Sequence, residues 1–159
     1  MTDEVIELNL GIWPSASISG GVLVQTDYST FLTFNALAQN SDGKYQDVGH
    51  ALVEFMYCQC TKFGYPNDEA RPGHPLYNKG LSNYGYGIFE VLNSSWIDQL
   101  VEQNRVHFPK TVRNPAHRHF IFTFHDSTFE CIAEDLKLEI LNLPYEQIFA
   151  RISQRVIKE

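Results

Sequence analysis

The chain has 159 residues, of which 43% are hydrophobic, 13% aromatic and 19% charged. This composition excludes a disordered chain and is typical of a single globular domain over residues 1–159. The net charge of -7 argues against a nucleic-acid-binding protein, in which a basic surface is expected.

The N-terminus and the cysteines indicate the compartment. The first residues, MTDEVIEL, are acidic and lack the basic region of a secretory signal, and no apolar run is long enough to predict a membrane span. The cysteines are Cys58, Cys60 and Cys131, an odd number and too few for a disulfide framework. We therefore expect three free thiols in a cytoplasmic protein that does not bind membranes. The sequence leaves homo-oligomerisation open.

The N-terminal part of the chain predicts antiparallel strands. Residues 5–12, 22–26 and 30–38 have strand-like patterns, and the Ser-, Gly- and Pro-rich segment 14–21 predicts a loop. Residues 50–63 form the longest predicted strand, with Cys58 and Cys60 on one face. Because this strand exceeds the usual length, we expect a bulge or bend in it.

A long segment rich in Pro and Gly, residues 66–83, predicts an irregular loop. Long loops in compact domains are uncommon and tend to be functional. Asp68, Glu69, Arg71 and His74 lie close together in it, which makes this loop the best candidate for a site. The alternative is a loop bonded internally, with Asp68 capping a turn and Arg71 paired to Glu69.

Two amphipathic helices are predicted in the C-terminal part. Ser95 begins the first, with Asp98 at the spacing of a capping box, and Pro109 ends it. The second begins near Pro144, since proline is favoured in the first turn.

A hairpin over residues 118–135, RHFIFTFHDSTFECIAED, is the predicted centre of the core. Asp126-Ser127 supplies the turn, because both side chains bond the local backbone. Folding there places Phe122 opposite Cys131 on an apolar face.

The other face of this hairpin is polar and carries His119, His125 and Glu130. We expect these residues to join the loop residues at one binding site. His117, His119 and Glu134 would converge at one end of the hairpin, but no metal-ligand spacing supports a metal there. Cross-strand pairs between His and Glu, such as His119 with Glu134, are the simpler explanation, so we expect no metal and no other cofactor.

Residues 103–125 contain no acidic residue and four Arg or Lys residues. This segment leads into the polar face, and a positive patch there would favour an anionic group on a ligand. The alternative is that these bases pair with the acidic part of the chain.

Three phrases carry a resemblance to a known family. They are FGYPNDEARPGHPLYNKGL (63–81), YGIFEVLNSSWIDQL (86–100) and HFIFTFHDSTFECIAEDL (119–136). They resemble a family of small uncharacterised bacterial hypothetical proteins, over the middle and C-terminal half of the chain. The resemblance implies a bacterial protein, but no activity and no site residue.

These patterns predict an α+β fold: a mainly antiparallel, strongly curved sheet or partly closed barrel with two amphipathic helices packed on it. A two-sheet sandwich with peripheral helices is the alternative. The absence of a catalytic motif favours a non-enzymatic module that binds a protein or a small ligand. The alternative is a small hydrolase or lyase that uses the 68–74 loop and the His and Glu residues of the hairpin.

Overall fold

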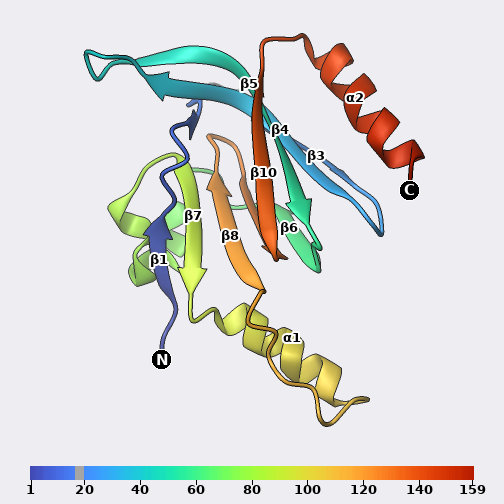
Figure 1. Cartoon of the computed structure of the whole chain (residues 1–159). Helices are drawn as coiled ribbons and strands as arrows, with labels where there is room; N and C mark the ends of the chain where they lie inside the picture. Colours follow the sequence, from blue (N-terminus) through green and yellow to red (C-terminus); the bar gives the residue numbers. More distant parts are fainter. Residues whose placement is uncertain (17–19) are drawn as a thin grey trace.

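The computed structural model describes residues 1–16 and 20–159, so part of the predicted 14–21 loop lies outside the described residues. Over the described ranges the chain forms ten strands in two antiparallel sheets, together with two α-helices (Figure 1). The predicted α+β class is confirmed. The sheets are neither closed into a barrel nor strongly curled, so the curved-sheet prediction is wrong in that detail.

Each sheet combines strands from separate parts of the chain. Sheet A has the order β1 (Glu4–Glu7), β7 (Gly87–Leu92), β8 (Arg118–Thr123), β9 (Thr128–Ala133) and β6 (Cys60–Gly64). Sheet B has the order β10 (Asp135–Leu141), β5 (Tyr45–Met56), β4 (Thr30–Gln39) and β2 (Trp13–Pro14), and β3 (Gly21–Gln25) also pairs with β4. The helices are α1 (Ser95–Arg105) and α2 (Tyr145–Ile157).

The main core lies between the two sheets and is aromatic. Phe55 of sheet B packs against Phe122 and Phe129 of sheet A, with ring centroids 5.6 and 5.3 Å apart. All three side chains are buried, because successive residues of a strand point to opposite faces and these occupy the inner ones. Two antiparallel sheets packed in this way form the sandwich that was the alternative prediction.

The predicted strand over residues 50–63 is interrupted where the chain passes from sheet B to sheet A. β5 ends at Met56, Tyr57 has a left-handed backbone (φ 51), and β6 begins at Cys60. The expected bend is present, but Cys58 and Cys60 do not share a face. Cys58 packs against the core between the sheets, whereas Cys60 lies opposite Ile132, on the outer face of sheet A.

The β8–β9 hairpin has the predicted faces in a different register. Phe122 lies opposite Phe129 instead of Cys131, and the loop is closed by Phe124 N–H donating to Ser127 O at 2.9 Å. The turn therefore falls one residue earlier than Asp126-Ser127. Such a shift in register by two residues keeps every side chain on its predicted face.

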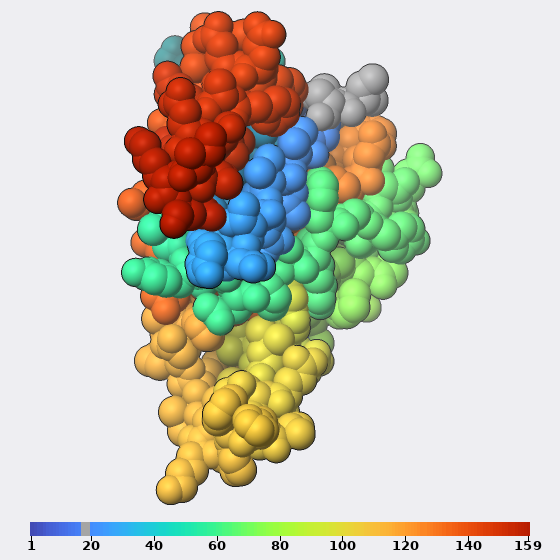
Figure 2. Space-filling model, turned by 90° about the vertical axis from the view of Figure 1, so that its right-hand side faces the viewer, coloured from blue at the N-terminus to red at the C-terminus, as the bar shows by residue number. Residues whose placement is uncertain are grey.

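The outer face of sheet B is covered by α2. Ile148 and Ile152 pack on Phe31 and Leu52, which point away from the core between the sheets. Figure 2 shows α2 beside β3 on this side of the molecule. The spacing of apolar residues along the helix explains its one buried stripe.

The outer face of sheet A is covered by residues 65–84. The predicted irregular loop contains three short 3-10 helices, η1 (Arg71–Gly73), η2 (Tyr77–Lys79) and η3 (Leu81–Asn83). Leu76 and Leu81 pack against Phe89 and Ile121 of the sheet in a second apolar cluster. The segment is therefore fixed across the hairpin face that carries the predicted polar residues.

The start of α1 lies at the edge of the same face. Ser94 is the N-cap, one residue before the predicted start, and its Oγ accepts a hydrogen bond from Ile97 N–H at 3.3 Å. Within the described part of the chain, no helix is long and apolar enough to span a membrane.

Candidate functional site

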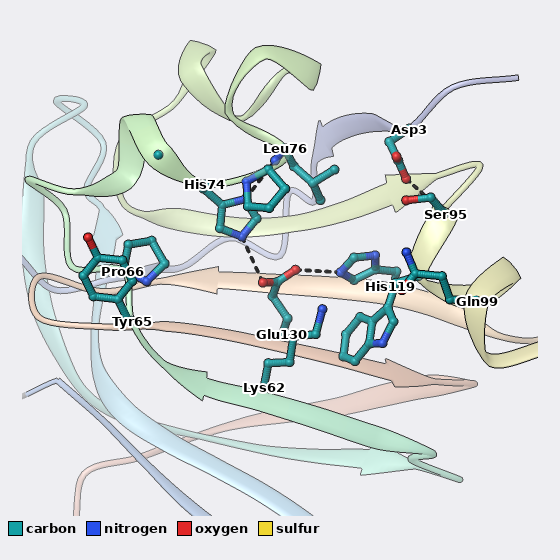
Figure 3. A pocket seen from close by; sticks show the side chains of 13 residues that line it. Asp3, Lys62, Tyr65, Pro66, His74, Leu76, Ser95, Gln99, His119 and Glu130 are labelled. Carbon is teal, nitrogen blue, oxygen red and sulfur yellow. Dashed lines mark hydrogen bonds and ion pairs between the residues drawn. The ribbon is translucent and has the colours of Figure 1, made fainter. Parts of the chain in front are cut away.

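A pocket of about 350 Å³ lies on the outer face of sheet A (Figure 3). It is enclosed by the 65–84 segment, by β6, β8 and β9, and by the first turn of α1. Three of the predicted site residues line it: His74 after η1, His119 on β8 and Glu130 on β9.

Glu130 joins the two histidines at the base of the pocket. His74 Nε2 is 2.9 Å from Glu130 Oε2, and His119 Nε2 is 2.9 Å from Glu130 Oε1. All three side chains are buried. His119 meets Glu130 diagonally across the β8–β9 pair, so the predicted pairing of His119 with Glu134 is wrong.

Hydrogen bonds to the other ring nitrogens determine which protons are present. His74 Nδ1 accepts a hydrogen bond from Leu76 N–H at 3.0 Å, so the ring proton lies on Nε2 and is donated to Glu130. His119 Nδ1 is 2.8 Å from Ser94 Oγ, which places the Ser94 hydroxyl in line to donate to it. The base of the pocket is therefore a connected and satisfied network.

The network keeps Glu130 ionised. Burial raises the pKa of this carboxyl, but the hydrogen bonds from His119 and His74 outweigh burial and lower its pKa to about 2. A general acid or base works best with a pKa near the working pH. Glu130 is therefore suited to holding the histidines in place, and poorly suited to proton transfer.

The hydrogen bonds of the two histidines also affect whether the pocket can bind a metal ion. Residues 1–16 and 20–159 contain no group of three His, Cys, Asp or Glu side chains placed to hold a metal ion. His74 would need to offer a bare Nε2 to a metal, but Leu76 N–H occupies Nδ1 and leaves the proton on Nε2.

Ser94, His119 and Glu130 form a line that has the residue types of a hydrolase triad. Ser94 is fully buried and does not line the pocket, and its Oγ already caps α1. A nucleophile has to reach the substrate. Ser94 is therefore placed to orient His119.

The rim of the pocket carries charged groups that sequence reasoning missed. Lys62 Nζ lies 3.9 Å from the ring centroid of Trp96. Asp3 Oδ1 accepts a hydrogen bond from Ser95 N–H at 2.7 Å. Asp3 and Ser95 are 92 positions apart, so no local spacing could have indicated this contact.

Asp68 and His125 lie at the hairpin turn and do not line the pocket. Asp68 Oδ2 accepts a hydrogen bond from Tyr86 OH at 2.5 Å, which lowers the pKa of Asp68. His125 Nδ1 is 2.7 Å from Asp126 and Nε2 is 3.9 Å from Asp68 Oδ2, and these two carboxylates raise the pKa of His125. Asp68, His125 and Asp126 form a cluster at the surface that is separate from the pocket.

The remaining candidates, Arg71 and Glu69, do not meet. Arg71 is buried, which lowers the pKa of its guanidinium, and its Nη1 donates to Gly85 O at 3.1 Å. Glu69 is exposed. The alternative prediction of an Arg71–Glu69 pair is therefore wrong, and the turn is bonded instead by Asn67 Oδ1, which accepts from Ala70 N–H.

The basic segment does not form a free positive patch beside the pocket. Three of its arginines pair with carboxylates: Arg105 with Glu102, Arg113 with Asp98, and Arg118 with Glu90. Arg113 and Arg118 thus pair with the acidic part of the chain, residues 1–100, as the alternative interpretation predicts, whereas Arg105 pairs within α1. The cation at the pocket is Lys62, from a different strand.

No family model matches the sequence, and no curated protein or solved structure is significantly similar to the chain.

Proposed function

We propose that this protein is a non-enzymatic module that binds a small polar molecule in the pocket formed by His74, His119 and Glu130. One observation carries the proposal: the groups at the base satisfy one another, whereas the rim groups Lys62 and Asp3 keep unused hydrogen-bonding capacity. A rigid base under a rim that can still bind is the arrangement of a preorganised ligand site.

The charges and the size of the pocket indicate the class of ligand. The Lys62 ammonium pairs with no carboxylate in the described ranges, and Asp3 Oδ2 likewise has no partner there. In Figure 3 they lie on opposite sides of His119. A small zwitterion such as a free amino acid would place its carboxylate at Lys62 and its ammonium at Asp3. A volume of about 350 Å³ suits a molecule of that size.

Two broader predictions remain part of this proposal. Free Cys58, Cys60 and Cys131 support a reducing compartment, and we place the protein in the cytoplasm. The resemblance of its phrases to small bacterial proteins supports a bacterial source.

The second candidate is a small hydrolase or lyase that uses His74 and His119. The observation that favours it is a buried pair of histidines ordered by a carboxylate in a pocket. Two features weigh against it: Glu130 has a pKa of about 2, and Ser94 does not line the pocket.

Calorimetric titration with a panel of free amino acids tests the proposal. We expect at least one to bind, and expect Lys62→Gln and Asp3→Asn each to weaken binding by about tenfold or more, as for a lost charge-assisted hydrogen bond. Asn at position 3 can still accept from Ser95 N–H, so the start of α1 is retained. Lys44→Gln, in the exposed turn between β4 and β5, is the matched control and should bind as the wild type does.

Two results would count against binding as the function. If no amino acid binds, or if both rim variants bind like the control, the rim does not recognise a zwitterion. If NMR shows that the bound molecule is converted to a product, and His74→Asn abolishes the conversion, the enzyme is the better assignment.

A further inference from the structure

We propose that Cys58 is a peroxide-reactive thiol and that Cys131 resolves its oxidised form to an intramolecular disulfide. This modification site lies on the inner face of sheet A, and the proposal does not depend on the function of the pocket.

The backbone holds the two cysteines side by side. On either side of Cys58, the chain is tied to the end of β9: Glu134 N–H donates to Met56 O at 2.9 Å, and Gln59 N–H donates to Ile132 O at 2.7 Å. Between these ties Cys58 packs against the core cluster that contains Cys131.

The two thiols differ in the way that oxidation of Cys58 by a peroxide and its resolution by Cys131 require. Cys58 is partly exposed and lies between two exposed residues, Tyr57 and Gln59, so a molecule as small as a peroxide can reach it. Its pKa is lowered to about 7, mainly by a hydrogen bond with Cys131, so thiolate is present near neutral pH. Cys131 is buried, which raises the pKa of its thiol well above the ordinary value. An accessible thiol of low pKa beside a second cysteine is the arrangement of reversible thiol oxidation.

The chemistry balances with a hydroperoxide as the oxidant. The Cys58 thiolate attacks one oxygen, the O–O bond breaks, and a sulfenic acid forms as hydroxide leaves. The Cys131 sulfur then attacks the Cys58 sulfur, an S–S bond forms, the S–O bond breaks, and the Cys131 proton leaves with the departing hydroxide as water. With hydrogen peroxide, two thiols are oxidised to one disulfide and the peroxide is reduced to two molecules of water.

Cys60 is close in sequence but is not the resolving residue. It lies on β6 opposite Ile132, on the outer face of sheet A, whereas Cys131 is part of the inner cluster with Cys58. Burial and the neighbouring Cys58 raise the pKa of Cys60 to about 11, so its thiolate is scarce at neutral pH. Cys60→Ser is therefore a matched control that leaves the reactive pair intact.

The test treats the full chain with hydrogen peroxide, titrates thiols in denaturant, and maps disulfide-linked peptides without reductant. We expect the number of free thiols to fall from three to one, with Cys60 as the remaining thiol, and dithiothreitol to restore all three. In Cys60→Ser the number should fall from two to none. In Cys131→Ser, dimedone should trap the sulfenic acid at Cys58, and in Cys58→Ser no disulfide should form.

Several outcomes would overturn the proposal. These are three thiols that survive a peroxide excess, a disulfide that contains Cys60, a disulfide between two chains, and oxidation of Cys58 to sulfinic acid with Cys131 still free in the unmutated chain. If Cys131→Ser fails to fold, the Cys60→Ser result alone decides between these outcomes and the expected one.

Discussion

Glu130→Gln tests whether the base of the pocket is held together by charge. Gln keeps the shape of the side chain and can accept from His74 through its oxygen. The Gln amide can donate to His119 Nε2 if the ring proton of His119 moves to Nδ1. Nδ1 can then donate this proton to Ser94 Oγ, which lies 2.8 Å away. The loss of stability therefore reports mainly the missing negative charge.

The magnitude follows from the pKa of Glu130. Its folded value of about 2 lies below the ordinary 4.5, so ionisation stabilises the folded state above pH 4.5 and this contribution is lost as the pH falls toward 2. With 1.36 kcal/mol per pKa unit, the contribution is about 3 kcal/mol at pH 7 and about 1.5 kcal/mol at pH 3. Glu130 is buried, so solvent screening reduces this little.

Urea unfolding of both proteins at pH 7 and pH 3 measures the difference. Other carboxylates titrate in both proteins and cancel in the comparison. Glu102→Gln, in an exposed pair with Arg105, is the control and should cost well under about 1 kcal/mol. If Glu130→Gln costs no more than this control at pH 7, or costs the same at both pH values, the charged network does not hold the site.

Three further predictions concern the core, the covering segment and the thiols. Phe122→Ala should lower the free energy of unfolding by about 3–5 kcal/mol, because Phe122 is fully buried between the sheets; a urea-measured loss below about 1 kcal/mol would contradict the assigned face. Gly80→Ala should destabilise the 65–84 segment, since Gly80 has φ 118 and an added Cβ would lie 2.6 Å from Val5 O; unchanged hydrogen exchange in that segment would refute this. Alkylation of Cys58 by iodoacetamide should rise with pH around a midpoint of about 7, and Cys131→Ala should move that midpoint upward by removing the hydrogen bond to the thiolate; identical profiles would show that Cys131 has no such effect.

Much of the fold could be predicted because alternation along a strand determines which side chains are buried. Phe120, Phe122 and Phe124 face the core as predicted, even though the hairpin register differs by two residues. A shift of two residues preserves both faces, so the apolar pattern alone does not select between the two registers. The register decides the partner of His119, and for that reason the predicted contact with Glu134 was wrong.

The composition of the 65–84 segment indicated a long loop with functional residue types, but not where it packs. Tertiary structure brought His74 to Glu130 across 56 positions and Asp3 to the start of α1 across 92. It also separated Asp68 and His125 from the pocket and placed Lys62 beside Trp96.

The sequence by itself therefore determined the α+β class, the buried faces of the hairpin and the approximate starts of both helices. These depend on local periodicity and capping, which involve residues a few positions apart. Only the tertiary structure decided the division into two sheets, the members of the pocket and the packing of Cys58 against the core cluster that contains Cys131. Those features depend on how distant segments pack, and that packing is set by the burial of apolar faces on both sides of sheet A, which no short stretch of sequence encodes.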